Sequence, residues 1–179
     1  GMVVGHSQTG EIDKIDGPYY FFTLIKKLRE MLPPWMPVLG IEGGRINLVP
    51  VDFVVEALSA LSAAPGSLGR TYHLCDPQPH SPGELAEMFA EAIGKTFAYV
   101  PVPMAVAKAF FAPKPVQRFF GMPLQALDYF DDPVRHDTTQ ATQDLGELGI
   151  ECPRLADYMP RLVAFYRSHR DAVRSEAMT

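Results

Sequence analysis

The sequence predicts a helix-rich α/β protein with few parallel strands, and three observations lead to that prediction. Short apolar stretches typical of buried strands alternate with helical patterns through the first 100 residues. Proline, at 17 of 179 residues, separates most of these stretches. From residue 101 onward the patterns are mainly helical. We therefore expect a sheet with crossover helices over 2–100 and a helical cap over 101–179, together forming one compact unit.

The first half of the chain reads as alternating strands and helices. Val3-Val4-Gly5 has the apolar character of a buried parallel strand that runs into a loop. A helix with apolar residues on adjacent turns is expected over 19–32, because the double proline that follows ends it. The further elements expected in this half are a strand at 45–51, a helix at 52–64, a strand at 70–76, a helix at 81–94 and a strand at 97–102.

Polar residues and glycines mark the helix ends. Ser81 and Glu84 have the spacing of a capping box, and Gly94 closes the same helix. Asp52 directly precedes an apolar helix, so a capping role is favoured over that of a carboxylate base. In the second half we expect two or three short apolar helices within 103–132, a helix over 137–149 that begins at Asp137 and ends at Gly149, and a last helix over 155–174.

Charge and cysteine usage disfavour several classes of function. The net charge is −5 and the basic residues are scattered, whereas nucleic-acid binding requires a clustered basic face. Cys75 and Cys152 lie far apart with no ligand at metal-site spacing, which favours free thiols in a reducing cytosol and no metal. Neither a signal-peptide pattern nor an apolar run of the roughly 20 residues that a membrane span requires is present. We expect a cytoplasmic protein without a nucleic-acid partner or transmembrane segment.

Three stretches in order resemble the C-terminal part of the extended short-chain dehydrogenase/reductases, within the NAD-dependent epimerase/dehydratase superfamily. They are GMVVGHSQTGE (1–11), INLVPVDFVVEALSAL (46–61) and GRTYHLCDPQPHSPGELAEMFAEAIG (69–94). GPYYFFTLIKKLREMLP (17–33) narrows the resemblance to the acyl-thioester and fatty-acyl reductases, which have male sterility-type NAD-binding domains. The resemblance covers about residues 2–110 clearly and the rest more loosely.

The resemblance implies late strands of a Rossmann-like sheet over 2–100, a substrate-binding cap over 101–179 and an NAD(P) cofactor in the parent enzyme. It places the loop at 5–11 beside the nicotinamide and the substrate. The residues implied near the nicotinamide are Gly5, His6 and Ser7, and those implied to bind substrate are Thr9, Gly10, Tyr19, Tyr20, Phe22, Phe110 and Phe111. Each role has a purely structural alternative. The loop at 5–11 can be a solvated polar loop, and the aromatic residues can belong to the core.

Two motifs of the family are missing from this sequence. The Gly-rich turn that binds the cofactor pyrophosphate does not occur, and none of the seven tyrosines has a lysine four residues later. We therefore assign no catalytic residue. We expect the chain to be the C-terminal portion of a longer fold, inactive by itself and without a bound NAD(P).

The sequence leaves two functions open. The first is the substrate-binding portion of an NAD(P)-dependent oxidoreductase that acts on an acyl thioester, aldehyde or similar apolar carbonyl compound; reductase, epimerase and dehydratase chemistry all fit the resemblance. The alternative is a non-catalytic binding or interaction module derived from a truncated member.

Two surface properties are also predicted. The stretch VPMAVAKAFFAPKPVQRFFG (102–121) fits either an apolar surface for an acyl chain or membrane interface, or core packing, which is favoured. Val3 and Val4 are expected to lie between a strand at 72–75 and a strand that this chain lacks. The open strand edge predicts a homodimer.

Overall fold

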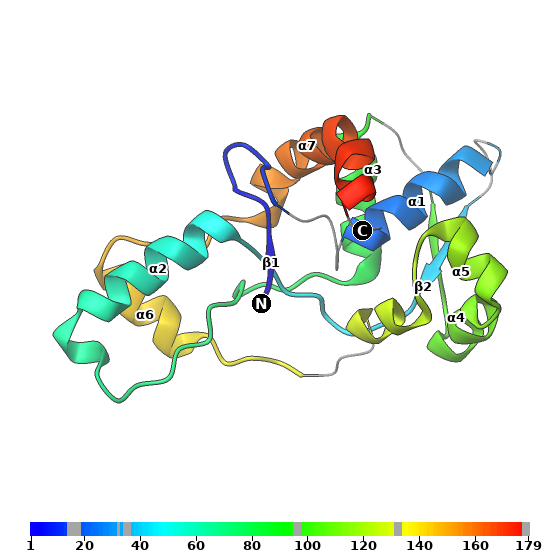
Figure 1. Ribbon diagram of the computed structural model, residues 1–179. Coiled ribbons are helices and arrows are strands. Elements are labelled where there is room, and N and C mark those ends of the chain that lie inside the picture. The colour runs from blue at the N-terminus through cyan, green and yellow to red at the C-terminus, as the bar shows by residue number, and fades with distance from the viewer. Residues whose placement is uncertain (14–18, 32, 34–36, 95–97, 131–133, 177–179) are drawn as a thin grey trace. The chain divides into compact units, whose positions relative to one another are not determined.

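The computed structural model describes residues 1–13, 19–31, 33, 37–94, 98–130 and 134–176 (Figure 1). The chain divides into two compact units. The first contains residues 1–13, 47–79 and 134–179, and the second contains 14–46 and 80–133. Each unit thus combines residues from both sides of residue 100, where the sequence analysis set the boundary between sheet and cap.

A short parallel sheet and three α-helices build the first unit. Its elements are β1 (Met2–Val4), β3 (Leu48–Pro50), α2 (Val51–Ala63), the 3-10 helix η1 (Pro65–Ser67), α6 (Thr139–Glu147) and α7 (Leu155–Glu176). β1 pairs with β3 in parallel, so that Val3 lies opposite Val49. α2 follows β3 without a loop, because Pro50 is both the last strand residue and the residue before the helix.

Apolar faces of the strand and helices form the core of the first unit. Val49, Phe53 and Leu145 belong to one buried cluster, which joins β3, α2 and α6. α7 adds Tyr158, which is 1% exposed and donates a 3.4 Å hydrogen bond from its hydroxyl to the Leu48 carbonyl of β3.

The second unit combines another two-stranded parallel sheet with short helices. Its elements are α1 (Tyr19–Met31), β2 (Val38–Ile41), α3 (Pro82–Ala92), β4 (Tyr99–Val102), α4 (Met104–Phe111), α5 (Lys114–Phe120) and the 3-10 helix η2 (Leu124–Phe130). β2 pairs with β4 in parallel. Phe22 of α1 stacks on Phe89 of α3 with ring centroids 4.9 Å apart, so aromatic packing joins these helices.

The helix-rich α/β prediction is confirmed, and most helices lie where the periodicity places them. The capping box of α3 is present: the Glu84 N–H donates to the Ser81 hydroxyl, and the Ser81 N–H donates to the Glu84 carboxylate at 2.6 Å. Gly94 and Gly149 follow their helices with φ of +68° and +76°, a conformation in which glycine avoids the strain of a side chain.

The strand predictions are wrong in two places. Residues 70–76 form no strand, because their alternating pattern instead puts Tyr72 and Leu74 against the core of the first unit. Consequently β1 has β3, and not 72–75, as its neighbour. The strand β2 was not predicted, because the prolines and glycines around it resemble a loop.

Two capping predictions also need correction. α2 begins at Val51 with Pro50 at its N-cap and no side-chain cap, so Asp52 lies inside the first turn and is not the cap. Asp137 lies one residue before the N-cap Thr138 of α6. It still binds the helix end, because its Oδ1 accepts a 3.0 Å hydrogen bond from the Thr139 N–H. Within the described ranges, no helix has both the length and the apolar character needed to cross a bilayer.

Candidate functional site

The loop that follows β1 lies next to the N-terminus of α2. β1 and β3 run in parallel, so both strands end at the same edge of the sheet. The loop at 5–11 leaves β1 at that edge, and α2 begins there directly after β3. The loop is the narrow turn that follows β1 in Figure 1. Residues far apart in sequence are thereby brought together in the first unit.

Ser7 is the centre of this loop. Its main-chain N–H donates to Asp52 Oδ1 at 2.8 Å, and its hydroxyl donates to Asp52 Oδ2 at 2.5 Å. Ser7 is almost fully buried, with 3% of the residue's surface exposed. Asp52 accepts both hydrogen bonds from the first turn of α2, where the positive end of the helix dipole also favours a carboxylate.

These contacts set the protonation state of Asp52. Burial by itself would raise the pKa of Asp52, but the hydrogen bonds from the Ser7 hydroxyl and N–H outweigh it. The pKa of Asp52 is therefore held below its usual value, and the carboxylate is ionised at neutral pH. An ionised carboxylate that accepts hydrogen bonds at this position serves as an anchor for the loop.

Two glycines allow the loop to close tightly. The Gly10 N–H donates to the His6 carbonyl at 2.7 Å, and the His6 N–H donates to the Glu11 carbonyl at 2.9 Å. Gly10 has a φ of +75°, and a Cβ there would overlap the carbonyl oxygen of Arg161. A Cβ at Gly5 would overlap the Gly10 carbonyl. Both positions therefore require glycine for the close approach of two backbone segments.

α7 holds the loop from the other side. The Arg161 guanidinium donates from Nη1 to the Ser7 carbonyl at 3.1 Å, and also to the Asp157 carbonyl within α7 at 3.4 Å. All three polar groups of Ser7 (N–H, hydroxyl and carbonyl) thus have partners on α2 or α7. The polar loop predicted as a candidate site is a tethered structure and not a loosely solvated segment.

His6 is partly exposed, and Gln8, Thr9 and Glu11 are exposed, so four polar side chains of the loop reach its surface. The Gln8 N–H donates to His6 Nδ1 at 3.1 Å, so the hydrogen of the neutral imidazole resides on Nε2. His6 Nδ1 is 3.9 Å from Asp52 Oδ2, too far for a hydrogen bond. Thr9 is exposed, and its Oγ1 accepts a 3.2 Å hydrogen bond from the Glu11 N–H. The side chain of His6 is 42% exposed, so both residues can offer a hydrogen-bond donor to a ligand.

The aromatic residues predicted to bind substrate lie in the second unit. Tyr19 and Phe22 are 1% and 2% exposed and contact each other edge to face with centroids 5.5 Å apart. Phe111 is buried, whereas Phe110 beside it is 53% exposed. The structure thus pairs Tyr19 with Phe22 and Phe110 with Phe111, and it buries three of the four. The side chain of Tyr20 lies outside the described residues.

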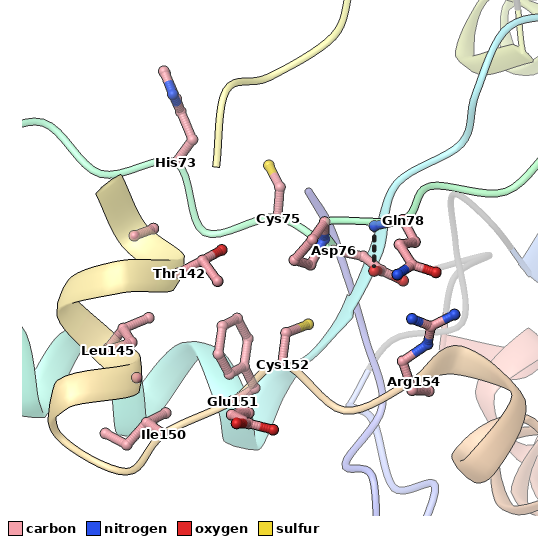
Figure 2. Close-up of a pocket in the computed structure, with 14 residues that line it drawn as sticks. His73, Cys75, Asp76, Gln78, Thr142, Leu145, Ile150, Glu151, Cys152 and Arg154 are labelled. Carbon is pink, nitrogen blue, oxygen red and sulfur yellow. Dashed lines mark hydrogen bonds between the residues drawn. The ribbon is translucent and has the colours of Figure 1, made fainter. Parts of the chain in front are cut away.

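A small pocket in the first unit was missed by sequence reasoning. It has a volume of about 200 Å³ and is lined from four segments: α2, 73–78, α6 and 150–154 (Figure 2). Phe53, Leu145 and Ile150 supply apolar lining, and Thr142, Glu151 and Arg154 supply polar groups. No local pattern could have indicated it, because its walls come from four separate stretches, one of which was predicted to be a strand.

Both cysteines line this pocket as free thiols, as the sequence predicts. Burial, together with the neighbouring Asp76 and Cys75, raises the pKa of the Cys152 thiol to about 12. The thiol is therefore protonated and a poor nucleophile at neutral pH. Among the described residues, no three His, Cys, Asp or Glu side chains are grouped as a metal site.

Comparison with known proteins places the loop within a recognised family region. Residues 1–58 match the NAD-binding family described as male sterility protein. Over 109 residues the chain is 34% identical to subunit 9 of the mitochondrial NADH dehydrogenase (ubiquinone) 1 alpha subcomplex of Arabidopsis thaliana, covering 59% of this chain and 25% of that protein. Over 78 residues it is 38% identical to the non-canonical nonribosomal peptide synthetase FrzA of Cladobotryum sp., covering 43% of this chain and 7% of that protein.

Solved structures show the same fold. The terminal R domain of the myxalamid PKS-NRPS biosynthetic pathway matches with a TM-score of 0.67 and 21% identity, over 97% of this chain and 43% of that chain. A thiolation-reductase di-domain of an archaeal nonribosomal peptide synthetase matches with a TM-score of 0.63 and 17% identity, over 94% of this chain and 35% of that chain. The triphenylmethane reductase of Citrobacter sp., complexed with NADP(H), matches with a TM-score of 0.51 and 20% identity, over 79% of this chain and 49% of that chain.

These matches confirm the predicted resemblance to the extended short-chain dehydrogenase/reductases. The chain spans less than half the length of each of these relatives and solved chains.

Proposed function

We propose that this extended short-chain dehydrogenase/reductase segment is the substrate-binding C-terminal portion of an NAD(P)-dependent oxidoreductase acting on an acyl thioester, an aldehyde or a similar apolar carbonyl compound. One observation carries the proposal. The loop at 5–11, inside the region that matches the NAD-binding family, is tied to both α2 and α7 through Ser7. Its construction is that of a preorganised binding loop.

Preorganisation is what supports a binding role for this loop. Ser7 is fixed by Asp52 and Arg161, so the backbone around His6 and Thr9 has little freedom left to lose when a ligand binds. The Nε2–H of His6 and the hydroxyl of Thr9 are donors of the kind that a carbonyl oxygen accepts. In the proposed function these two side chains orient the substrate carbonyl, and the tethers behind them hold that orientation.

The described residues do not fit a complete NAD(P) site. A pyrophosphate group binds at a helix N-terminus through a Gly-rich turn, and the sequence has no such turn. At the N-terminus of α2, the Asp52 carboxylate already occupies the electropositive end and would repel a phosphate. We therefore derive no hydride-transfer step within this chain and assign it the substrate side of the reaction.

The proposed substrate class rests on the relatives. Two matched structures are named as a terminal R domain of a PKS-NRPS pathway and as a thiolation-reductase di-domain. Those names favour a carbonyl substrate delivered as a thioester over a sugar nucleotide.

Titration of the isotopically labelled chain followed by NMR tests the proposal. Octanal and the octanoyl thioester of N-acetylcysteamine serve as probes, and octan-1-ol is the control because it has the same chain but no carbonyl group. We expect saturable shifts of the 6–11 amide signals with both carbonyl compounds, weakened by Thr9→Val and His6→Gln and nearly absent with octan-1-ol. If neither probe shifts these signals, the chain is better described as a non-catalytic binding module.

The class of reaction has a separate test. The reading frame upstream of this sequence can be determined directly. In the proposed enzyme it encodes a Gly-rich turn followed by a Tyr-x-x-x-Lys motif, which together supply the cofactor site and the proton donor. A stop codon immediately upstream would contradict the oxidoreductase assignment.

A further inference from the structure

Two adjacent short helices of the second unit expose large apolar side chains. Val106 and Phe110 on α4 are 55% and 53% exposed, and Phe119 on α5 is 54% exposed. Ala109, Ala112 and Pro113 are also exposed and lie in the same two helices or their connection. We call the surface formed by Val106, Phe110, Lys114, Arg118 and Phe119 the α4–α5 surface. Core packing therefore accounts for Phe111 and Phe120 of the aromatic stretch at 102–121 but not for Phe110 and Phe119.

The exposed rings rest on buried ones. Phe110 contacts the buried Phe111 with centroids 5.2 Å apart, and Phe119 contacts the buried Phe120 at 5.1 Å. Phe111 and Phe120 in turn contact each other at 5.5 Å. Packing in the core therefore holds the two exposed rings in place, and they do not need to be ordered when a partner binds.

The charge of this surface is opposite to that of the chain. Residues 103–127 contain three basic residues and no acidic residue, whereas the whole chain carries −5. Lys108 is paired with Asp128 at 3.1 Å, which leaves Lys114 and Arg118 as the exposed cations that flank the rings. Lys27 adds a third positive charge, with its ammonium 5.4 Å from the centroid of the Phe119 ring.

We propose that the α4–α5 surface docks on a lipid bilayer that carries anionic headgroups. Exposed phenylalanines beside lysine and arginine suit the outer part of a bilayer. The aromatic rings enter the outer acyl-chain region, and the cations bind the phosphates of the headgroups. Charge argues against a second copy of this chain on the same face. A two-fold contact there would bring Lys114 and Arg118 of both copies together, and like charges across an interface oppose association.

Vesicle co-sedimentation of the whole chain tests this proposal. One set of vesicles consists of phosphatidylcholine alone, and the other also contains phosphatidylserine. We expect binding to the phosphatidylserine vesicles only, falling as salt is added because the attraction of the cations is screened. Absence of binding to the anionic vesicles, or equal binding to both kinds, would overturn the proposal.

Two double variants separate the apolar and the electrostatic contributions to vesicle binding. Phe110→Ser with Phe119→Ser removes the apolar insertion, and Lys114→Glu with Arg118→Glu reverses the charge; each should weaken binding about tenfold or more. Val55→Ser with Leu58→Ser is the matched control, because these residues of α2 are 61% and 58% exposed in the first unit and should not affect binding. Circular dichroism confirms that each variant is folded. Equal loss of binding in the control variant would contradict docking through α4 and α5.

Size-exclusion chromatography of the same variants measures their oligomeric state and provides a second test. If the wild-type chain is a dimer that Phe110→Ser with Phe119→Ser converts to a monomer, the surface joins copies of the chain and the bilayer proposal is wrong. If these substitutions leave the oligomeric state unchanged while abolishing vesicle binding, the proposal stands.

Discussion

The Ser7 hydroxyl donates a 2.5 Å hydrogen bond to Asp52, a residue 45 positions later in the chain. The Ser7 N–H donates to the same carboxylate, and the Ser7 carbonyl accepts from Arg161. A single buried serine thereby links the loop after β1 to α2 and to α7. Because buried polar groups are costly when their partners are removed, this residue offers a direct test of how firmly the loop is held.

Ser7→Ala should destabilise the first unit. The substitution removes one hydrogen bond to a charged group and leaves part of the Asp52 carboxylate without its partner, at a cost of about 1–3 kcal/mol. Urea unfolding measures the change in the free energy of unfolding. Ser62→Ala is the control, because the Ser62 hydroxyl makes only an exposed local bond to the Ser59 carbonyl and its loss should change little. Equal stability of Ser7→Ala and wild type would show that the tether is weak.

The same contact makes stability depend on pH. The pKa of Asp52 is lower in the folded chain than in the unfolded chain, because the Ser7 hydrogen bonds outweigh burial. Its contribution is therefore fully present above the ordinary carboxyl pKa of about 3.9 and is lost as the pH falls through the lower folded value. We expect the difference in unfolding free energy between wild type and Asp52→Asn to shrink as the pH falls below that range. A difference that stays constant would contradict the lowered pKa.

Gly10→Ala should be costlier than the same change at a position of similar backbone conformation. Gly10 and Gly69 both have a φ of +75°, but a Cβ at Gly10 would overlap the Arg161 carbonyl, whereas a Cβ at Gly69 would meet open space. Gly69→Ala therefore reports backbone strain alone, on the order of 1 kcal/mol. Gly10→Ala adds a displacement of α7 or of the loop. Thermal unfolding of the two variants measures the difference, and equal losses would show that α7 does not press on Gly10.

How much of the site the sequence can predict depends on how local its signals are. Gly5, Ser7 and Gly10 were named because the short stretch GMVVGHSQTGE resembles a strand of the family and the loop after it, which is a local signal. The role of Ser7 was not predicted, because its partners Asp52 and Arg161 are 45 and 154 positions away. For the same reason Asp52 was taken for a helix cap, although its carboxylate serves a neighbouring segment.

The fold shows the same division between local and distant signals. The capping box of Ser81 and Glu84 could be predicted because both partners lie within one helical turn. The short strand β2 could not, because only its pairing with the distant β4 makes it a strand. The aromatic stretch at 102–121 was expected to be core, and Phe111 and Phe120 are buried, but which neighbours stay exposed depends on tertiary packing.

The whole chain is not expected to bind NADH or NADPH with useful affinity. The Gly-rich turn is absent from the sequence, and the Asp52 carboxylate occupies the helix end where a phosphate would bind. Calorimetric titration with each cofactor tests this, and the Citrobacter triphenylmethane reductase, described in complex with NADP(H), serves as the positive control. A dissociation constant in the low micromolar range would contradict the prediction.

The chain should form a dimer through β1. Among the described residues β1 pairs with β3 alone, and Val3 on this strand is 46% exposed. A strand edge of this kind leaves N–H and C=O groups that a second copy can pair across a two-fold axis.

Val3→Lys is the suitable variant to test this dimer, because a charge at the strand edge opposes pairing without disturbing the interior. Val4 is unsuitable, because it is 1% exposed and part of the core. Light scattering after size exclusion should show a wild-type dimer, a Val3→Lys monomer and no change in Val55→Lys, whose side chain is exposed on α2. A wild-type monomer at high concentration would show that this edge does not join copies of the chain.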